Sequence, residues 1–152
     1  MLDTLKSFLS EFGEGTKTAP QFEAGDYRLA AAALLVHVMT IDGQEKEQEH
    51  DKLRAVLRKQ FDLDDAQTDA LIDAATAADR EAIDLYRFTS LLNRSLDEAG
   101  RLRIVEMMWE IVYADGKVNE FEDNVIWRAA DLLHISSRDR VEMRRRVSGQ
   151  DA

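Results

Sequence analysis

The chain contains no cysteine, which excludes disulfides, thiolate metal sites and cysteine nucleophiles. It has one proline and seven glycines, so few residues interrupt long helices. No apolar run reaches the roughly 18 residues that a spanning helix needs, and the longest, residues 29–39, already contains His37. Positive charge is also scarce: 20 lysines and arginines stand against 30 acids, for a net charge of −10. Because phosphate backbones would repel such a chain, we expect no nucleic-acid partner. The lack of a long apolar run predicts no membrane insertion, and the absence of cysteine favours a cytoplasmic location.

The residues that are abundant favour helices. Hydrophobic residues make up 45% of the chain and charged residues 33%, a mix typical of globular domains with a charge-rich surface. A chain of 152 residues is long enough for one domain with a sizeable core. No segment alternates polar and apolar residues between turn signals as strands do. We therefore predict an all-α fold, a single-domain bundle of about seven or eight helices.

Side chains that cap helices mark where the predicted helices begin. Asp26 is expected to cap a helix that ends at Asp42-Gly43, and a turn of the chain is expected around Asp79. Spaced pairs predict four later helix starts, namely Asp64 with Gln67, Ser95 with Glu98, Asn119 with Glu122, and Ser136 with Asp139.

Two regions are expected along the chain. Residues 1–25 read as an N-terminal amphipathic arm followed by a linker with three glycines and the one proline. Residues 26–148 form the helical domain. Near its end lies a cluster of basic residues, for which we expect a solvated helix face that complements the helix dipole rather than a recognition patch. The cluster comprises Arg138, Arg140, Arg144, Arg145 and Arg146.

A short acidic phrase occurs twice and is the most informative feature of the sequence. The first copy spans residues 41–49 (IDGQEKEQE) and the second residues 114–122 (ADGKVNEFE). Each copy follows one apolar, helix-forming run and leads into another. The pattern predicts two related helix–turn–helix halves, with carboxylates gathered at each turn.

A turn at each glycine would bring these carboxylates together. Along one continuous helix, Asp42 and Glu49 would lie about 10 Å apart and could not share an ion. Glycine allows the chain to reverse, so the acid on the next helix returns beside the first. Carboxylates and turn carbonyls are the oxygen ligands that calcium and magnesium prefer. The candidate ligands of a divalent cation are therefore Asp42 and Glu49 in the first half, and Asp115 and Glu122 in the second.

Neither turn is an EF-hand loop, because the two upstream ligand positions hold Val38 and Thr40 in one copy and Ile111 and Tyr113 in the other. Each turn offers a partial ligand set, and two partial sets could complete one site. The alternative is purely structural: acids in a first turn complement the helix dipole, and the pairing of Asn119 with Glu122 explains that glutamate as a cap.

Other chemistry is poorly supported. His37, His50 and His134 are too dispersed for a transition-metal site, and His37, within an apolar run, is expected to be a core or interface residue. No serine or threonine has an evident histidine partner, and no glycine-rich phosphate loop is present. A carboxylate-based hydrolase would need carboxylates of raised pKa in a buried cleft, whereas the turns are expected to be solvated.

The two acidic phrases and their flanks resemble the TerB-like proteins, a family named for bacterial tellurite resistance. Residues 29–43 (LAAAALLVHVMTIDG) are similar to the first family signature, and residues 109–116 (WEIVYADG) with Glu120 and Glu122 are similar to the second. Residues 84–89 and 128–133 fit a branch of small stand-alone bacterial members. The resemblance covers about residues 26–147.

The resemblance implies a helical bundle of two related halves whose turn acids bind a divalent cation. By position these acids are Asp42, Glu49, Asp115 and Glu122. It also implies protein partners in a membrane-associated metal- or tellurite-stress complex. Some relatives join the domain to a J-domain, but this chain has no His-Pro-Asp, so a co-chaperone role is not transferred. We expect a non-enzymatic cation-binding interaction module; the alternative is a plain helical interaction scaffold without a metal site.

Overall fold

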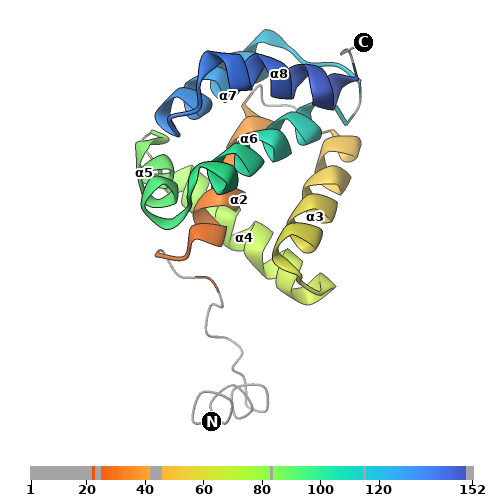
Figure 1. The fold of residues 1–152 in the computed structure, drawn as a ribbon. Helices are drawn as coiled ribbons and strands as arrows, with labels where there is room; N and C mark the ends of the chain where they lie inside the picture. The colour runs from red at the N-terminus through yellow and green to blue at the C-terminus, as the bar shows by residue number, and fades with distance from the viewer. Residues whose placement is uncertain (1–21, 23–24, 42–45, 83, 115, 150–152) are drawn as a thin grey trace, which may run out of the picture.

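The computed structural model describes residue 22 and residues 25–41, 46–82, 84–114 and 116–149. Within these residues every regular element is a helix (Figure 1), which confirms the all-α prediction. The seven helices are α2 (Tyr27–Thr40), α3 (Glu47–Phe61), α4 (Asp65–Glu81), α5 (Tyr86–Ser95), α6 (Glu98–Val112), α7 (Glu120–Leu132) and α8 (Ser137–Ser148).

Helix α2 forms the centre of the bundle. It packs against α3, α4, α5, α6 and α7, and Figure 1 shows it crossing behind α6. Ten of its 14 residues are buried, including four consecutive alanines at residues 30–33. Their small side chains let the neighbouring helices approach closely on every side, which suits a helix that is apolar all round.

The helix starts follow the predicted caps at most positions. The Asp26 carboxylate accepts the N–H of Arg28 at 2.9 Å and pairs with its guanidinium at 2.7 Å. The hydrogen bond from the Arg28 side chain lowers the pKa of Asp26 below its ordinary value. The capping boxes of Asp64 with Gln67 and of Asn119 with Glu122 are both present. Ser136 caps α8, as expected.

Two predicted boundaries are wrong. Ser95 is the last residue of α5 and caps nothing; the Asp97 side chain caps α6 instead, by accepting the N–H of Gly100 at 2.9 Å. The chain does not turn at Asp79, because α4 continues to Glu81. An aspartate two residues before the helix end does not stop a run of helix-favouring alanines, and the chain turns just after Glu81 instead.

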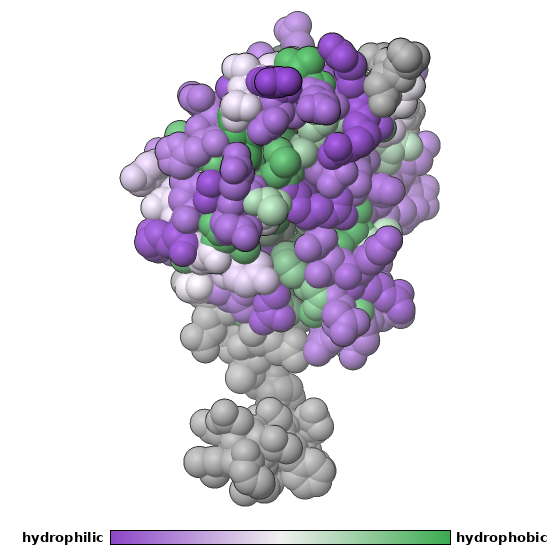
Figure 2. Space-filling model, in the orientation of Figure 1, coloured by the Kyte–Doolittle hydropathy of each residue, from purple (hydrophilic) through white to green (hydrophobic). Residues whose placement is uncertain are grey.

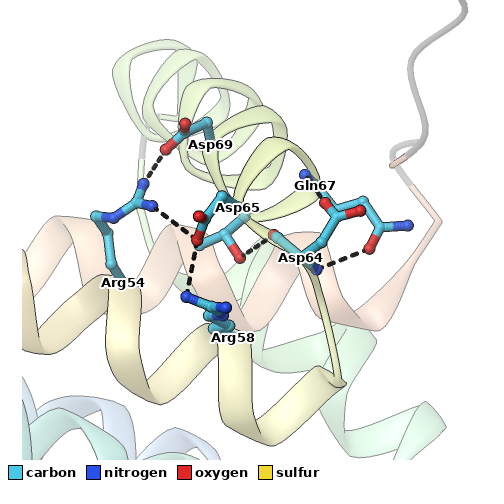
Figure 3. A network of polar contacts seen from close by, with 7 residues as sticks. Arg54, Arg58, Asp64, Asp65, Gln67 and Asp69 are labelled. Atoms are coloured by element: carbon cyan, nitrogen blue, oxygen red, sulfur yellow. Dashed lines mark hydrogen bonds and ion pairs between the residues drawn. The ribbon is translucent and has the colours of Figure 1, made fainter.

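Arginines of α3 hold the start of α4. Arg58 donates to the Asp65 carboxylate at 2.8 Å, and Arg54 approaches it at 3.5 Å while also pairing with Asp69. Figure 3 shows both guanidinium groups reaching from α3 to the first turns of α4, beside the capping pair of Asp64 and Gln67. Since these acids are well exposed, the ion pairs orient the two helices more than they stabilise the fold.

The surface is mostly polar, as the face in Figure 2 shows: hydrophilic residues dominate it and hydrophobic ones are scattered. No helix in the described part of the chain is long and apolar enough to cross a membrane. Of the predicted arm and linker, only Phe22 and Gly25 are described. Phe22 is buried in the core beneath the Arg28 guanidinium, and the amphipathic stretch itself lies outside the described residues.

Candidate site at the two acidic turns

The second acidic turn lies between α6 and α7. Gly116 has φ +83°, the left-handed conformation that glycine allows, and Asn119 then caps α7. Glu122 lies in the first turn of α7 with its carboxylate directed back: its Oε1 accepts the N–H of Asn119 at 3.2 Å. The Glu122 side chain is completely buried. Asp115 lies outside the described residues.

The first acidic turn lies between α2 and α3. Helix α3 begins after Lys46, whose side chain makes no capping hydrogen bond. Glu49 occupies the position equivalent to Glu122, and it too has no exposed surface. The Lys46 ammonium lies 3.6 Å from Glu49 Oε2. Asp42 lies outside the described residues.

The expectation that these turns are solvated is therefore wrong for the two glutamates. Only four polar or charged residues are buried in the described part of the chain, and the only charged ones are Glu49 and Glu122. Sequence reasoning missed this because the surrounding phrases are strongly polar. The signal that could have found it is helical spacing: Glu49 lies one turn before Leu53, and Glu122 one turn before Ile126, both core residues.

The structure does not by itself assemble a complete ligand set. Among the described residues no three acids or histidines gather closely enough to hold a metal ion. The four-carboxylate set includes Asp42 and Asp115, so that arrangement stays a prediction. The donor chemistry fits a hard cation, because carboxylates held close to turn carbonyls are oxygen ligands.

An open cleft of about 520 Å³ adjoins both turns. It is bounded by the start of α3, the end of α6 and the end of α8. Its lining carries both signs of charge, with Asp51 and Lys52 on one side and Glu110 and Tyr113 on the other. None of the described residues that line it is a serine, threonine or histidine, so these residues offer no hydroxyl–imidazole pair for nucleophilic catalysis.

The arginines of α8 form the expected solvated face only in part, because two of the five pack against aromatic rings. Arg140 stacks over the Trp127 ring at 4.6 Å and donates to the Trp127 carbonyl at 2.9 Å. Arg144 lies 5.0 Å over the Trp109 ring, donates to the Tyr113 hydroxyl at 3.1 Å and pairs with Asp123 at 3.1 Å. Aromatic rings of α6 and α7 thus hold two of the five arginine side chains against the helical bundle. Arg138, Arg145 and Arg146 remain exposed.

His37 is an interface residue, as the sequence predicts. Its Nδ1 lies 2.8 Å from the Asp79 carboxylate, which joins α2 to α4 across their long contact. The pair belongs to no larger ligand cluster in the described chain, so it is best read as a structural tie between the two helices.

The comparison with protein families decides the relationship. The family described as "Tellurite resistance protein TerB" matches residues 28–145. The chain belongs to the TerB family. The match begins in the first turn of α2 and ends within α8, so the TerB region spans α3 to α7 in full, most of α2 and α8, and both acidic phrases of the sequence. No curated protein and no solved structure matched this chain in the corresponding comparisons.

Proposed function

We propose that this TerB-family chain is a non-enzymatic cytoplasmic module that binds a divalent cation at its acidic turns. Its helical surface would bind protein partners that act in a metal-, tellurite- or envelope-stress response. Asp42, Glu49, Asp115 and Glu122 would supply the ligands, and calcium or magnesium is the expected ion. The observation that carries the proposal is the complete burial of Glu49 and Glu122 at equivalent positions of the two halves.

Burial of this kind exceeds what a helix cap requires. Gln67 occupies the same place in the capping box of α4 and remains partly exposed. Removing an ionised carboxylate from water is expensive, on the order of several kcal/mol. A capping role alone does not explain why a carboxylate is desolvated at two matching positions. Binding of a cation explains it, because the burial that disfavours a carboxylate anion also strengthens its attraction to a metal ion.

The second candidate, a plain interaction scaffold, has one specific observation in its favour. The Lys46 ammonium lies 3.6 Å from Glu49, so the chain itself supplies positive charge at the first turn. On that reading both glutamates serve the architecture, and partner binding would survive a chelator.

Thermal unfolding with and without divalent ions separates the two. We expect millimolar calcium or magnesium to raise the Tm of the metal-stripped chain by several degrees, as a ligand that binds only the folded state must. The double variant Asp42→Asn, Asp115→Asn should lose this shift. The matched control is Glu47→Gln with Glu120→Gln, which removes two charges from exposed positions of the same first turns and should keep it. A wild-type shift no larger than that given by sodium chloride of equal ionic strength would refute cation binding and favour the scaffold.

A further inference from the structure

Helices α7 and α8 lie at one end of the bundle, where both pack on α6 (Figure 1). The Arg140 guanidinium stacks on the Trp127 ring, and the Arg144 guanidinium pairs with Asp123 at 3.1 Å. Because these contacts join later residues of α8 to earlier residues of α7, the two helices run antiparallel. The start of α7 is therefore level with the end of α8, and their outward sides form one surface.

This outward surface, called the outer face, is basic and partly apolar. On each helix it consists of residues three and four positions apart, on the side opposite the buried Ile126 of α7 and Met143 of α8. Two of the four large hydrophobic residues exposed in the described chain belong to it. The outer face comprises six exposed residues, Phe121, Asn124 and Arg128 of α7 and Arg138, Val141 and Arg145 of α8.

The arginines of the outer face have no internal partner. Within the described part of the chain, the side chains of Arg128, Arg138 and Arg145 form neither a hydrogen bond nor an ion pair. Glu142 lies between the last two on α8 and pairs with neither. Helix α8 carries five arginines against two acids, in a chain whose net charge is −10. The outer face is therefore a local positive surface on an acidic protein.

We propose that the outer face binds an acidic amphipathic helix of a partner protein. This inference rests on the partner binding in the proposed function and not on the cation. Aromatic and arginine side chains contribute most at protein interfaces, and Phe121 and Val141 offer contacts to apolar side chains of the partner. Arg138 and Arg145 lie about 10 Å apart along the helix axis, so two acids seven residues apart on a partner helix match their spacing.

Other occupants fit the outer face less well. A phosphate backbone is repelled by the net charge of −10. Helices that bind a membrane surface bury a whole apolar face, whereas this one has two exposed large hydrophobic residues, Phe121 and Val141. A second copy packed about a two-fold axis would oppose arginine to arginine. An acidic partner is repelled mainly by distant acids, and physiological salt screens charges beyond about 8 Å.

Fluorescence anisotropy with labelled peptides tests the outer face, with the full chain kept in EDTA. The probe is a peptide of about 18 residues, long enough to form a helix, whose leucine stripe is flanked by glutamates at heptad spacing. The control peptide carries lysine in place of each glutamate. We expect the acidic peptide to bind about tenfold more tightly than the basic one. The net charge of the chain alone predicts the opposite order.

Charge reversal on α8 should remove this preference. Arg138→Glu with Arg145→Glu should weaken binding of the acidic peptide about tenfold, because two attractions become repulsions. The matched control is Arg80→Glu with Arg87→Glu, which reverses two exposed arginines that also lack a partner in the described chain but lie on α4 and α5. The control should change the affinity by less than about twofold.

The exposed ring of the outer face provides a second variant. Phe121→Gln should weaken binding of the acidic peptide about fivefold, whereas Tyr86→Gln, which removes the exposed ring of α5, should leave it unchanged. Because Phe121 is 57% exposed, this variant keeps the test decisive even if the charge-reversed chain folds poorly.

The outcomes separate this proposal from the cation site. An acidic peptide that binds no more tightly than the basic one, or equal losses in the control variants, would overturn the proposal. Binding to phosphatidylglycerol vesicles in place of the peptide, or self-association that Arg138→Glu with Arg145→Glu abolishes, would also overturn it, by naming a membrane or a second copy as the occupant. Peptide binding without any ion-induced rise in Tm would support the outer face and refute only the cation site.

Discussion

The two acidic turns share a buried glutamate and differ in the described residues that lie beside it. Both bury a glutamate completely, Glu49 after the first turn and Glu122 after the second. Their surroundings are not alike: Lys46 places an ammonium beside Glu49, whereas Asn119 builds a capping box with Glu122. Because the glutamate is buried in both turns although the residues beside it differ, its burial is not a consequence of those neighbouring residues. The buried carboxylate is therefore the better candidate for function, and the caps are local solutions to helix starts.

Truncation of the two glutamates should give the largest changes in stability and the clearest difference between the two turns. We expect Glu122→Ala to lower the free energy of unfolding by about 2–3 kcal/mol, because it removes both a capping interaction and a buried side chain. Glu49→Ala should cost less, about 1–2 kcal/mol, because the Lys46 side chain, 25% exposed, can turn to water once its partner is gone. Urea unfolding in EDTA measures both.

Equal losses of unfolding free energy for the two truncations, or a larger loss for Glu49→Ala, would contradict this prediction. Either result would mean that burial, and not the neighbouring cap or ammonium, determines how much each glutamate contributes to stability. Glu122→Gln provides the control, since the amide oxygen can still accept the Asn119 N–H. Its unfolding free energy in EDTA should lie within about 1 kcal/mol of the wild type.

The caps allow a gentler test. Asn119→Ala should destabilise the chain by about 1 kcal/mol, the usual loss when a capping amide is removed.

Lys46→Asn places at the start of α3 the residue type that caps α7, and it also removes the Lys46 ammonium from the first turn. In EDTA we expect the new cap to offset only part of the loss of the ammonium beside the buried Glu49. The ion-induced rise in Tm should be larger than in the wild type, because the ion no longer competes with Lys46 for Glu49. An unchanged ion response would show that this ammonium and the ion do not share the carboxylate.

Sequence patterns predicted the helices well because capping and helical periodicity are local. The start of α2 at Asp26 and the boxes at Asp64 and Asn119 follow from side chains three residues apart or closer. The failure at Ser95 shows the limit of this reasoning: α5 continues through Ser95, and Asp97, an equally good cap residue two positions later, starts α6 instead.

The candidate site was harder to predict because the burial of its glutamates depends on tertiary packing. The sequence indicates that Glu49 and Glu122 belong to matching turns, but not that the bundle closes over them. The arginines of α8 make the same point. Their spacing is that of a solvated face, yet Trp109 and Trp127 hold Arg144 and Arg140 against other helices. Cation–π contacts between elements leave no short-range pattern in a sequence.

The smallest effect on stability is expected at the residue just before each buried glutamate. Phe121 precedes Glu122 and is 57% exposed, whereas the first turn has Gln48, exposed and polar, at the same place. Phe121→Gln should therefore change the free energy of unfolding by less than about 0.5 kcal/mol in urea, as most exposed substitutions do. The reverse change, Gln48→Phe, should be equally mild. A loss above about 1 kcal/mol for Phe121→Gln would show that this ring supports the second turn, and that the two turns differ in packing as well as in charge.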